Sequence, residues 1–338
     1  MAAYTTINDP ELYFQTKLYT GDGNSTQAIT LDGSEDMQPD FVWIKNRTDA
    51  HWHNLNDSVR GVGAGEVLRT NNNGAEGGTS GNVSVIGSNG FTVAEGSSDA
   101  EEVNTSSDTY VAWNWKESVT AGFDIVLYTG TGSNLDASHN LSAVPDFFMI
   151  KQRSSDQAWR VYHKNMTTAN PYSNRMVISE DGGETTNALG LDADPTSSVI
   201  NIGTGTGCTN DDGETYVSYI WAEKQGFSKF GSYVGNGNVD GPFIYTGFRP
   251  AFVLTKSTGT AYWQILDNKR DIDNPAITAL FPNASDADTT SYNTDFLSNG
   301  FKQRVTTTSR NGSGTTYIYA AFAEAPFVNS NGVPCNAR

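Results

Sequence analysis

The stretch Gln38–Lys45, QPDFVWIK, decides the fold, because two related stretches follow it along the chain. They are Val144–Lys151, VPDFFMIK, and Arg249–Lys256, RPAFVLTK, and the three stand roughly 105 residues apart. Each contains a proline and a phenylalanine and ends a short apolar run with a lysine. A short apolar run rich in aromatic and β-branched residues is typical of a buried strand. The sequence therefore predicts the same buried strand three times.

Two further landmarks repeat with the same period. A glycine-rich turn with an aromatic residue precedes each strand, at Leu18–Gly23, Leu127–Gly132 and Ser232–Gly237. An alternating strand closes each copy, at Asp108–Trp113, Glu214–Tyr219 and Thr315–Ala320. Agreement at several landmarks indicates a true internal repeat.

We therefore predict three copies, at residues 17–117, 123–224 and 227–327, joined by very short connections. Residues 1–16 are predicted to form an N-terminal attachment arm, and residues 328–338 a C-terminal tail. Short connections favour fixed packing between the copies over flexible beads. In this interpretation the tandem copies form a rigid spacer with loops at one edge.

The apolar residues within a copy come in short runs or at every second position, and Gly, Asn, Asp and Ser separate them. This pattern predicts an all-β chain with little helix. Copies of about 100 residues suggest antiparallel two-sheet sandwiches of jelly-roll or concanavalin-like type. The range Ser58–Arg69 is the best candidate for a helix, but three glycines interrupt it.

The 338 residues include 21 Lys and Arg against 38 Asp and Glu, a formal net charge of −17. Such a chain repels nucleic acid, so we exclude nucleic-acid binding. We found no basic start before an apolar run and no apolar stretch of membrane-spanning length, so we expect a soluble protein without membrane insertion. Cys208 and Cys335 are too few for a disulfide framework and are predicted to be free thiols.

Trp52, Trp159 and Trp263 recur seven or eight residues after the shared lysine. An exposed tryptophan can stack on a sugar ring, so the three are candidate glycan-binding residues. A tryptophan at the same place in every copy is also what a core residue would produce. The sequence leaves both interpretations open.

Loop residues offer the candidate metal ligands. Calcium prefers flexible, oxygen-rich loops, and the candidates for it are Asn210, Asp211, Asp212 and Glu214. His51 and His53 could bind zinc only with a third ligand, which the sequence does not indicate. No cofactor is otherwise expected.

Catalytic motifs are not found. The sequence has no Gly-x-Ser-x-Gly turn and no phosphate-binding glycine loop. Its carboxylates stand in runs on loops, which is a poor way to hold the pair that a glycosidase needs. We therefore predict that the protein is not an enzyme.

Several segments resemble a domain family of tailed bacteriophages of marine bacteria, whose members are tail-fibre or other virion proteins with lectin-like β-sandwiches. The resemblance covers nearly the whole chain and rests on Tyr13–Gly21, Gln38–Arg47, Asp57–Gly61, Phe227–Tyr233, Asp240–Pro250 and Tyr317–Phe327. The family offers no catalytic motif that maps onto these residues.

The resemblance implies a structural protein, made in the host cytoplasm and displayed on the virion surface. We expect a tail-fibre or surface appendage that binds host polysaccharide, contacts other virion proteins and forms a homo-oligomer, a trimer if it is a fibre. One alternative is a capsid-decorating or head-fibre protein with mainly protein contacts. Another is a polysaccharide depolymerase.

Overall fold

The computed structural model describes residues 4–97, 102–166, 171–186, 190–204 and 209–335. These residues form antiparallel strands and three short 3-10 helices, which confirms the predicted all-β class. The helices are η1 (Pro10–Leu12), η2 (Ala64–Glu66) and η3 (Pro171–Ser173). The candidate helix Ser58–Arg69 is reduced to the single turn η2. None of the helices in the described residues has the length and apolar character needed to cross a membrane.

The strands fall into three groups, which we call copies 1, 2 and 3. Copy 1 holds β1 (Phe14–Thr20), β2 (Thr26–Thr30), β3 (Phe41–Asn46), β4 (Asn54–Asp57), β5 (Asn82–Gly87), β6 (Gly90–Ala94) and β7 (Thr109–Trp115). Copy 2 holds β8 (Phe123–Thr129), β9 (Leu135–Ser138), β10 (Phe147–Gln152), β11 (Arg160–His163), β12 (Val199–Ile202) and β13 (Thr215–Trp221). Copy 3 holds β14 (Ser228–Val234), β15 (Phe243–Tyr245), β16 (Phe248–Ser257), β17 (Gln264–Asp267), β18 (Thr294–Leu297), β19 (Gly300–Gln303) and β20 (Thr316–Pro326).

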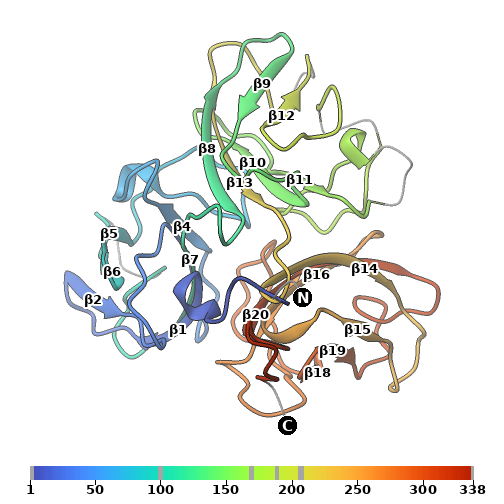
Figure 1. The fold of residues 1–338 in the computed structure, drawn as a ribbon. Coiled ribbons are helices and arrows are strands. Elements are labelled where there is room, and N and C mark those ends of the chain that lie inside the picture. The colour runs from blue at the N-terminus through green and yellow to red at the C-terminus, as the bar shows by residue number, and fades with distance from the viewer. Residues whose placement is uncertain (1–3, 98–101, 167–170, 187–189, 205–208, 336–338) are drawn as a thin grey trace.

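Among the described residues, each copy has one four-stranded sheet with the same strand order. The orders are β1-β7-β3-β4, β8-β13-β10-β11 and β14-β20-β16-β17. A smaller sheet accompanies each one, β2-β6-β5 in copy 1, β9-β12 in copy 2 and β15-β19-β18 in copy 3. Figure 1 shows the copies arranged around a common centre.

The repeated strand is buried on both faces, which explains its unbroken apolar run. In β3, Phe41 and Trp43 belong to the core shared between copies, whereas Val42 and Ile44 belong to the core between the two sheets of copy 1. Successive side chains of a strand point to opposite faces. Every residue of β3 and of its equivalent β10 is buried.

The lysine that ends the repeated strand is buried in every copy. Lys45, Lys151 and Lys256 are 0% exposed, and each Nζ donates to the carbonyl of the next residue, at 2.6, 2.6 and 2.8 Å. Burial lowers the pKa of Lys45 and of Lys256 to about 8. The buried lysine ammonium group thus holds the backbone where the strand passes into the following loop.

The three large sheets share one hydrophobic core. Trp115, Trp221 and Phe322 occupy equivalent places in β7, β13 and β20. Their ring centroids lie 6.1, 5.5 and 6.5 Å apart for the pairs Trp115–Trp221, Trp115–Phe322 and Trp221–Phe322. The copies are therefore not strung out as a spacer, and that expectation was wrong. They pack side by side around a pseudo-threefold axis (Figure 1).

Backbone hydrogen bonds close the three copies into a ring. The Glu76 N–H donates to the Arg153 carbonyl and the Glu184 N–H to the Thr258 carbonyl, both at 2.8 Å. The Asp288 N–H donates to the Arg47 carbonyl at 3.0 Å. Copy 1 thus contacts copy 2, copy 2 contacts copy 3, and copy 3 returns to copy 1.

The N-terminal segment lies against copy 3 of the same chain. Ile7 is buried in the shared core, and the Tyr4 hydroxyl donates to the Gly247 carbonyl at 2.7 Å. Asn8 Nδ2 donates to Ser330 Oγ at 2.8 Å, which joins the two terminal segments. The first strand begins at Phe14, inside the range assigned to the arm. The other predicted boundaries stay predictions.

Candidate functional site

Two of the predicted glycan-binding tryptophans are core residues. Trp159 and Trp263 are 0% and 1% exposed. Trp159 Nε1 donates to the Arg69 carbonyl of copy 1 at 2.8 Å, and Trp263 Nε1 donates to the Val177 carbonyl of copy 2 at 2.9 Å. Each indole joins its copy to the preceding one, and its ring cannot reach a sugar.

His53, not Trp52, is the equivalent of these tryptophans in copy 1. It directly precedes β4, as Trp159 precedes β11 and Trp263 precedes β17. His53 Nε2 lies 2.9 Å from the Phe281 carbonyl of copy 3. Its Nδ1 accepts from Trp43 Nε1 at 2.8 Å, so the neutral ring carries its proton on Nε2 and donates it to Phe281. The same ring-closing contact therefore occurs in all three copies.

Burial holds two histidines neutral and so makes stability sensitive to acid. Desolvation lowers the pKa of His53 to about 3 and that of His163 to about 4, against about 6.5 in an unfolded chain. The unfolded chain binds more protons in this window. Stability is thus lost as the pH falls from about 6.5 toward these values, by up to about 1.4 kcal/mol per pH unit for each histidine.

We predict that the double variant Trp43→Met/His53→Trp loses less stability in acid. It places in copy 1 the residues that copy 2 has there, Met149 and Trp159, and removes one titrating group. Urea midpoints at pH 7, 5 and 4 measure the loss for variant and parent. An equal loss in both would show that His53 does not contribute.

Trp52 is the remaining exposed tryptophan of the predicted set. Its side chain is 48% exposed, and the Arg69 guanidinium carbon lies 5.1 Å from its ring centroid. Arg69 is also paired with Glu102 at 2.9 Å. Trp52 lines a pocket of about 250 Å³ with His51 and Glu102. A cation already covers the indole, so it is a weaker sugar platform than a bare ring.

The predicted calcium loop has a structural role at Asn210. Asn210 is buried, its Nδ2 donates to the carbonyls of Ser133 and Gly203, and its Oδ1 accepts from the Thr131 N–H. Asn104 and Asn311 hold the glycine-rich turns of copies 1 and 3 in the same way. The Asn210 side chain is therefore committed to its own turn.

For the other residues of that loop, calcium binding stays a prediction. Asp212 is exposed, and Glu214 accepts a short hydrogen bond from Ser154 Oγ. In the described residues, His, Cys, Asp or Glu ligand atoms come within 4.8 Å of one another at Asp49, His51 and Asp108 instead. In this group, Asp49 and Asp108 could act as metal ligands together with His51. His53 is not part of the group, because its Nε2 is hydrogen-bonded to the Phe281 carbonyl.

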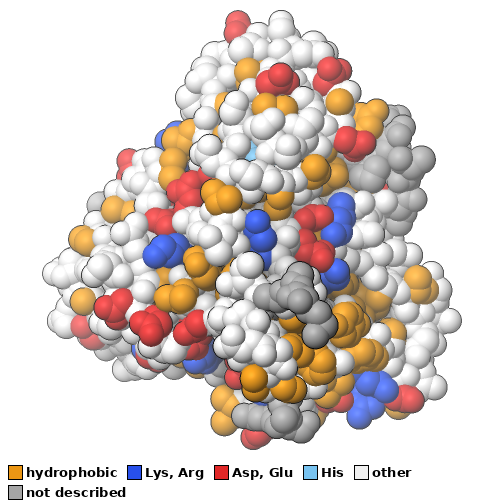
Figure 2. Space-filling model, in the orientation of Figure 1, with side chains coloured by type: hydrophobic (Ala, Val, Ile, Leu, Met, Phe, Trp, Pro, Cys, Tyr) orange, Lys and Arg blue, Asp and Glu red, His pale blue; other side chains and the backbone are white. Residues whose placement is uncertain are grey.

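The outer face of the small sheet of copy 3 presents two aromatic side chains. Phe243 and Tyr245 of β15 are 46% and 54% exposed, whereas Ile244 between them is buried. Alternate residues of a strand lie about 7 Å apart on one face. On the face drawn in Figure 2, hydrophobic side chains gather over copy 3. We call Phe243 and Tyr245 the aromatic strip.

The other copies have no aromatic residues at these places. Ile29 pairs with Phe91 as Ile244 pairs with Phe301, so Ala28 and Thr30 are the equivalents in copy 1. In copy 2, Ala137 is the buried residue, and Asp136 and Ser138 flank it. The core of the sheet does not require the aromatic strip, since two copies fold without one.

Gly300 leaves room for the Phe243 ring. A Cβ at Gly300 would lie 2.1 Å from the Ile244 carbonyl oxygen and 3.0 Å from Phe243 Cε2. The ring therefore lies over the glycine, where a side chain would otherwise stand.

Polar groups surround the aromatic strip. Lys302, the β-sheet partner of Phe243, is paired with Asp240 at 2.6 Å. Arg304 is paired with Asp295 at 2.7 Å. The Tyr4 hydroxyl lies 3.4 Å from that of Tyr245. Flat apolar rings with hydrogen-bonding groups at their edges suit a ligand that has both an apolar face and hydroxyl groups.

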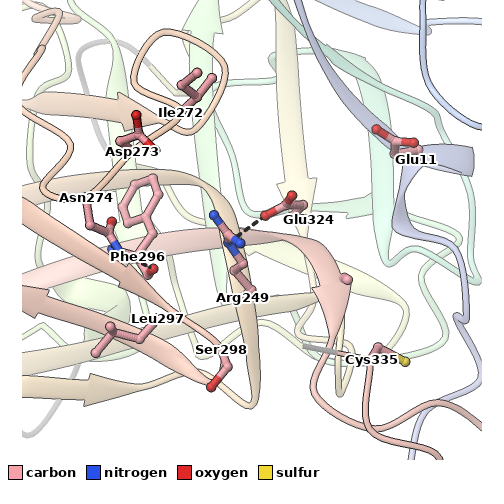
Figure 3. A pocket seen from close by; sticks show the side chains of 11 residues that line it. Glu11, Arg249, Ile272, Asp273, Asn274, Phe296, Leu297, Ser298, Glu324 and Cys335 are labelled. Carbon is pink, nitrogen blue, oxygen red and sulfur yellow. Dashed lines mark hydrogen bonds and ion pairs between the residues drawn. The ribbon is translucent and has the colours of Figure 1, made fainter. Parts of the chain in front are cut away.

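A pocket of about 660 Å³ adjoins the aromatic strip. Leu297 lines it and pairs with Gly300, which in turn pairs with Tyr245. In its lining, the Arg249 guanidinium and the Glu324 carboxylate form an ion pair at 2.7 Å (Figure 3). The other lining residues are Glu11, Ile272, Asp273, Asn274, Phe296, Ser298, Ala325 and Cys335.

Sequence reasoning did not find this site. The sequence signal for it was the segment Phe243–Tyr245, in which two aromatic residues flank an isoleucine. In copy 1, alanine and threonine flank the equivalent isoleucine. Of the two cysteines, Cys335 is an exposed free thiol at the pocket, and Cys208 lies outside the described residues.

A family model described as a domain of unknown function (DUF7483) matches residues 9–326. A comparison with curated proteins finds no match.

Proposed function

The chain belongs to the DUF7483 family, and we propose that it is a non-enzymatic virion protein that binds a host-surface glycan through the aromatic strip. The observation that carries the proposal is the exposure of Phe243 and Tyr245 beside a polar pocket. At the equivalent positions, copies 1 and 2 carry small or polar residues. The resemblance to phage tail-fibre proteins supports the virion assignment.

A glycan suits this site chemically. The apolar face of a sugar ring can stack on Phe243 or Tyr245 while its hydroxyl groups reach Lys302, Asp240 and Arg304. The pocket beyond Leu297 offers acceptors and donors in Glu324 and Arg249 for a neighbouring sugar. Burying a few exposed aromatic side chains is the usual source of affinity in such sites.

Binding is favoured over depolymerisation by the arrangement of the carboxyl groups. One carboxyl pair with a raised pKa is Glu117 and Asp124, where burial and the hydrogen bond to Asp124 raise the pKa of Glu117 to about 8. Their contact is direct, whereas the two carboxyl groups of a glycosidase stand about 5–9.5 Å apart across the substrate. Both residues flank the connection between copies 1 and 2.

We predict that Phe243→Ala/Tyr245→Thr, which places the residues of copy 1 on copy 3, weakens glycan binding about 10- to 100-fold. Binding of the purified protein to host cells and to a bacterial glycan array measures the effect. Trp52→Ala is the matched control and should bind like the parent. Unchanged binding by the double variant, or loss of binding by Trp52→Ala, would move the site away from the aromatic strip.

Other virion proteins are the proposed partners, and the homo-oligomer remains part of the proposal. Placement on the tail or on the head distinguishes an appendage from a capsid-decorating protein. Cryo-electron microscopy of intact particles would locate it, and density on the head would reject the tail assignment.

A further inference from the structure

Arg310 is a buried cation for which the described part of the chain provides no carboxylate partner. The residue is 0% exposed, and Nε, Nη1 and Nη2 of its guanidinium are all buried. The Tyr233 hydroxyl interacts with the guanidinium, but it is neutral and serves one N–H group at most. Buried polar groups in native proteins are almost always satisfied by protein, water or an ion. A buried charge without an opposite charge beside it therefore needs a specific explanation.

Other buried arginines of this chain have carboxylate partners. Arg60 is paired with Asp57 and Glu76, and Arg270 with Asp267 and Asp288, in each case with a fully buried guanidinium. The chain thus follows the usual rule that a buried arginine is paired with an acid. Arg310 departs from this rule.

Copy 1 shows that the fold does not require a charge at this place. The carbonyls of Val103, Thr209 and Arg310 accept from the tyrosine hydroxyls of Tyr19, Tyr128 and Tyr233, so these three residues are equivalent. In copy 1, Val103 belongs to the core between the two sheets. Arg310 therefore points a guanidinium to where copy 1 has a valine.

Two neighbouring positions change together with Arg310. Val83 pairs with Val93 in copy 1, and Thr294 pairs with Gln303 at the equivalent places in copy 3. All four side chains are buried, and Thr294 Oγ1 lies 3.1 Å from Gln303 Oε1. Copy 3 thus has a cluster of buried polar residues, Thr294, Gln303 and Arg310, where copy 1 has three valines.

The groups that face the guanidinium are neutral. They are the hydroxyls of Tyr233, Tyr292 and Tyr317. The Tyr233 hydroxyl accepts from Gln303 Nε2, donates to the Arg310 carbonyl and also interacts with the Arg310 guanidinium. Burial, more than any other cause, lowers the pKa of Arg310 to about 10, so the side chain is still charged at neutral pH. None of these tyrosines can balance the charge, because burial raises the pKa of each.

We propose that the interior of copy 3 binds a small monovalent anion of the size of chloride on the Arg310 guanidinium. A single charge is all that one guanidinium balances. The guanidinium has no exposed surface, so a sugar carboxylate or a phosphate ester would not reach it. The anion would supply the negative charge that the described residues do not place beside Arg310, and an acceptor for the guanidinium N–H groups that Tyr233 does not serve.

Thermal unfolding in matched salts tests the proposal. The full chain is compared in sodium gluconate, sodium chloride and sodium bromide at equal ionic strength. Chloride and bromide should raise the midpoint of unfolding by about 2–4 °C over gluconate, because a ligand bound only by the folded state stabilises it. Arg310→Met, which keeps the volume and removes the charge, should fold and show no difference between the salts.

Arg304→Met is the matched control, since Arg304 is an exposed arginine of the same copy and its variant should keep the halide dependence. A crystal grown in bromide should show anomalous scattering beside Arg310. Equal midpoints of the parent in all three salts, halide dependence that persists in Arg310→Met, or water alone beside Arg310 in bromide would each overturn the proposal.

Discussion

Replacing Trp221 with alanine is expected to lower the free energy of unfolding by about 3–5 kcal/mol, because a fully buried tryptophan leaves a large cavity. Its ring lies 4.8 Å from Phe123, 5.5 Å from Phe147 and 6.1 Å from Trp115. The site lies where the three copies meet. All three copies should therefore lose stability together and unfold in one transition.

Urea unfolding followed by fluorescence and by far-UV circular dichroism measures this effect. Trp52→Ala, at an exposed tryptophan of copy 1, is the control and should change the free energy of unfolding by less than about 0.5 kcal/mol. A variant in which copies 1 and 3 keep their stability while copy 2 unfolds would contradict the shared core. Hydrogen exchange resolved by peptide distinguishes these outcomes.

The second large effect is expected at Asp267, whose replacement by alanine should cost about 3–5 kcal/mol. Its Oδ2 accepts from Arg270 Nε at 2.6 Å and from Trp113 Nε1 of copy 1 at 3.0 Å. Both members of the Asp267–Arg270 pair are fully buried. Removing the acid leaves the buried Arg270 guanidinium with Asp288 as its one remaining carboxylate and with the Ile265 carbonyl, and it leaves the Trp113 indole N–H without its acceptor.

Copy 2 provides the matched control for Asp267. It carries His163 and Met166 at the places of Asp267 and Arg270, so that copy folds without the ion pair. The double variant Asp267→His/Arg270→Met should therefore be more stable than Asp267→Ala. Denaturant midpoints compare the two. If the double variant were less stable than the single one, the unpaired arginine would not be the cause of the loss.

Much of the fold was predictable from local patterns. The apolar run Phe41–Ile44 and its two relatives predicted the central strands, and the alternating segments predicted the closing strands. The arrangement of the three copies in a ring was harder to predict. The sequence signal for it was that these apolar runs have no polar residue at every second position, because a strand covered on both faces has no solvent-facing side chains.

The equivalence of His53 with Trp159 and Trp263 could not be found from spacing. The loop between the shared lysine and the next strand varies by one residue between copies. A tryptophan seven residues after the lysine and one eight residues after it were therefore both consistent with an equivalent position. The residue before the strand decides the equivalence, and that requires the strand register. The aromatic strip could also be found only from the strand register, because the register shows that Phe243 of copy 3 is equivalent to Ala28 of copy 1.

The most direct test of the proposed function is a crystal structure of the full chain with the best-binding oligosaccharide from the glycan array. The account predicts a sugar ring stacked on Phe243 or Tyr245, with its hydroxyl groups directed to Lys302, Asp240 or the adjoining pocket. Sugar bound at Trp52 or elsewhere, with the aromatic strip bare, would contradict it.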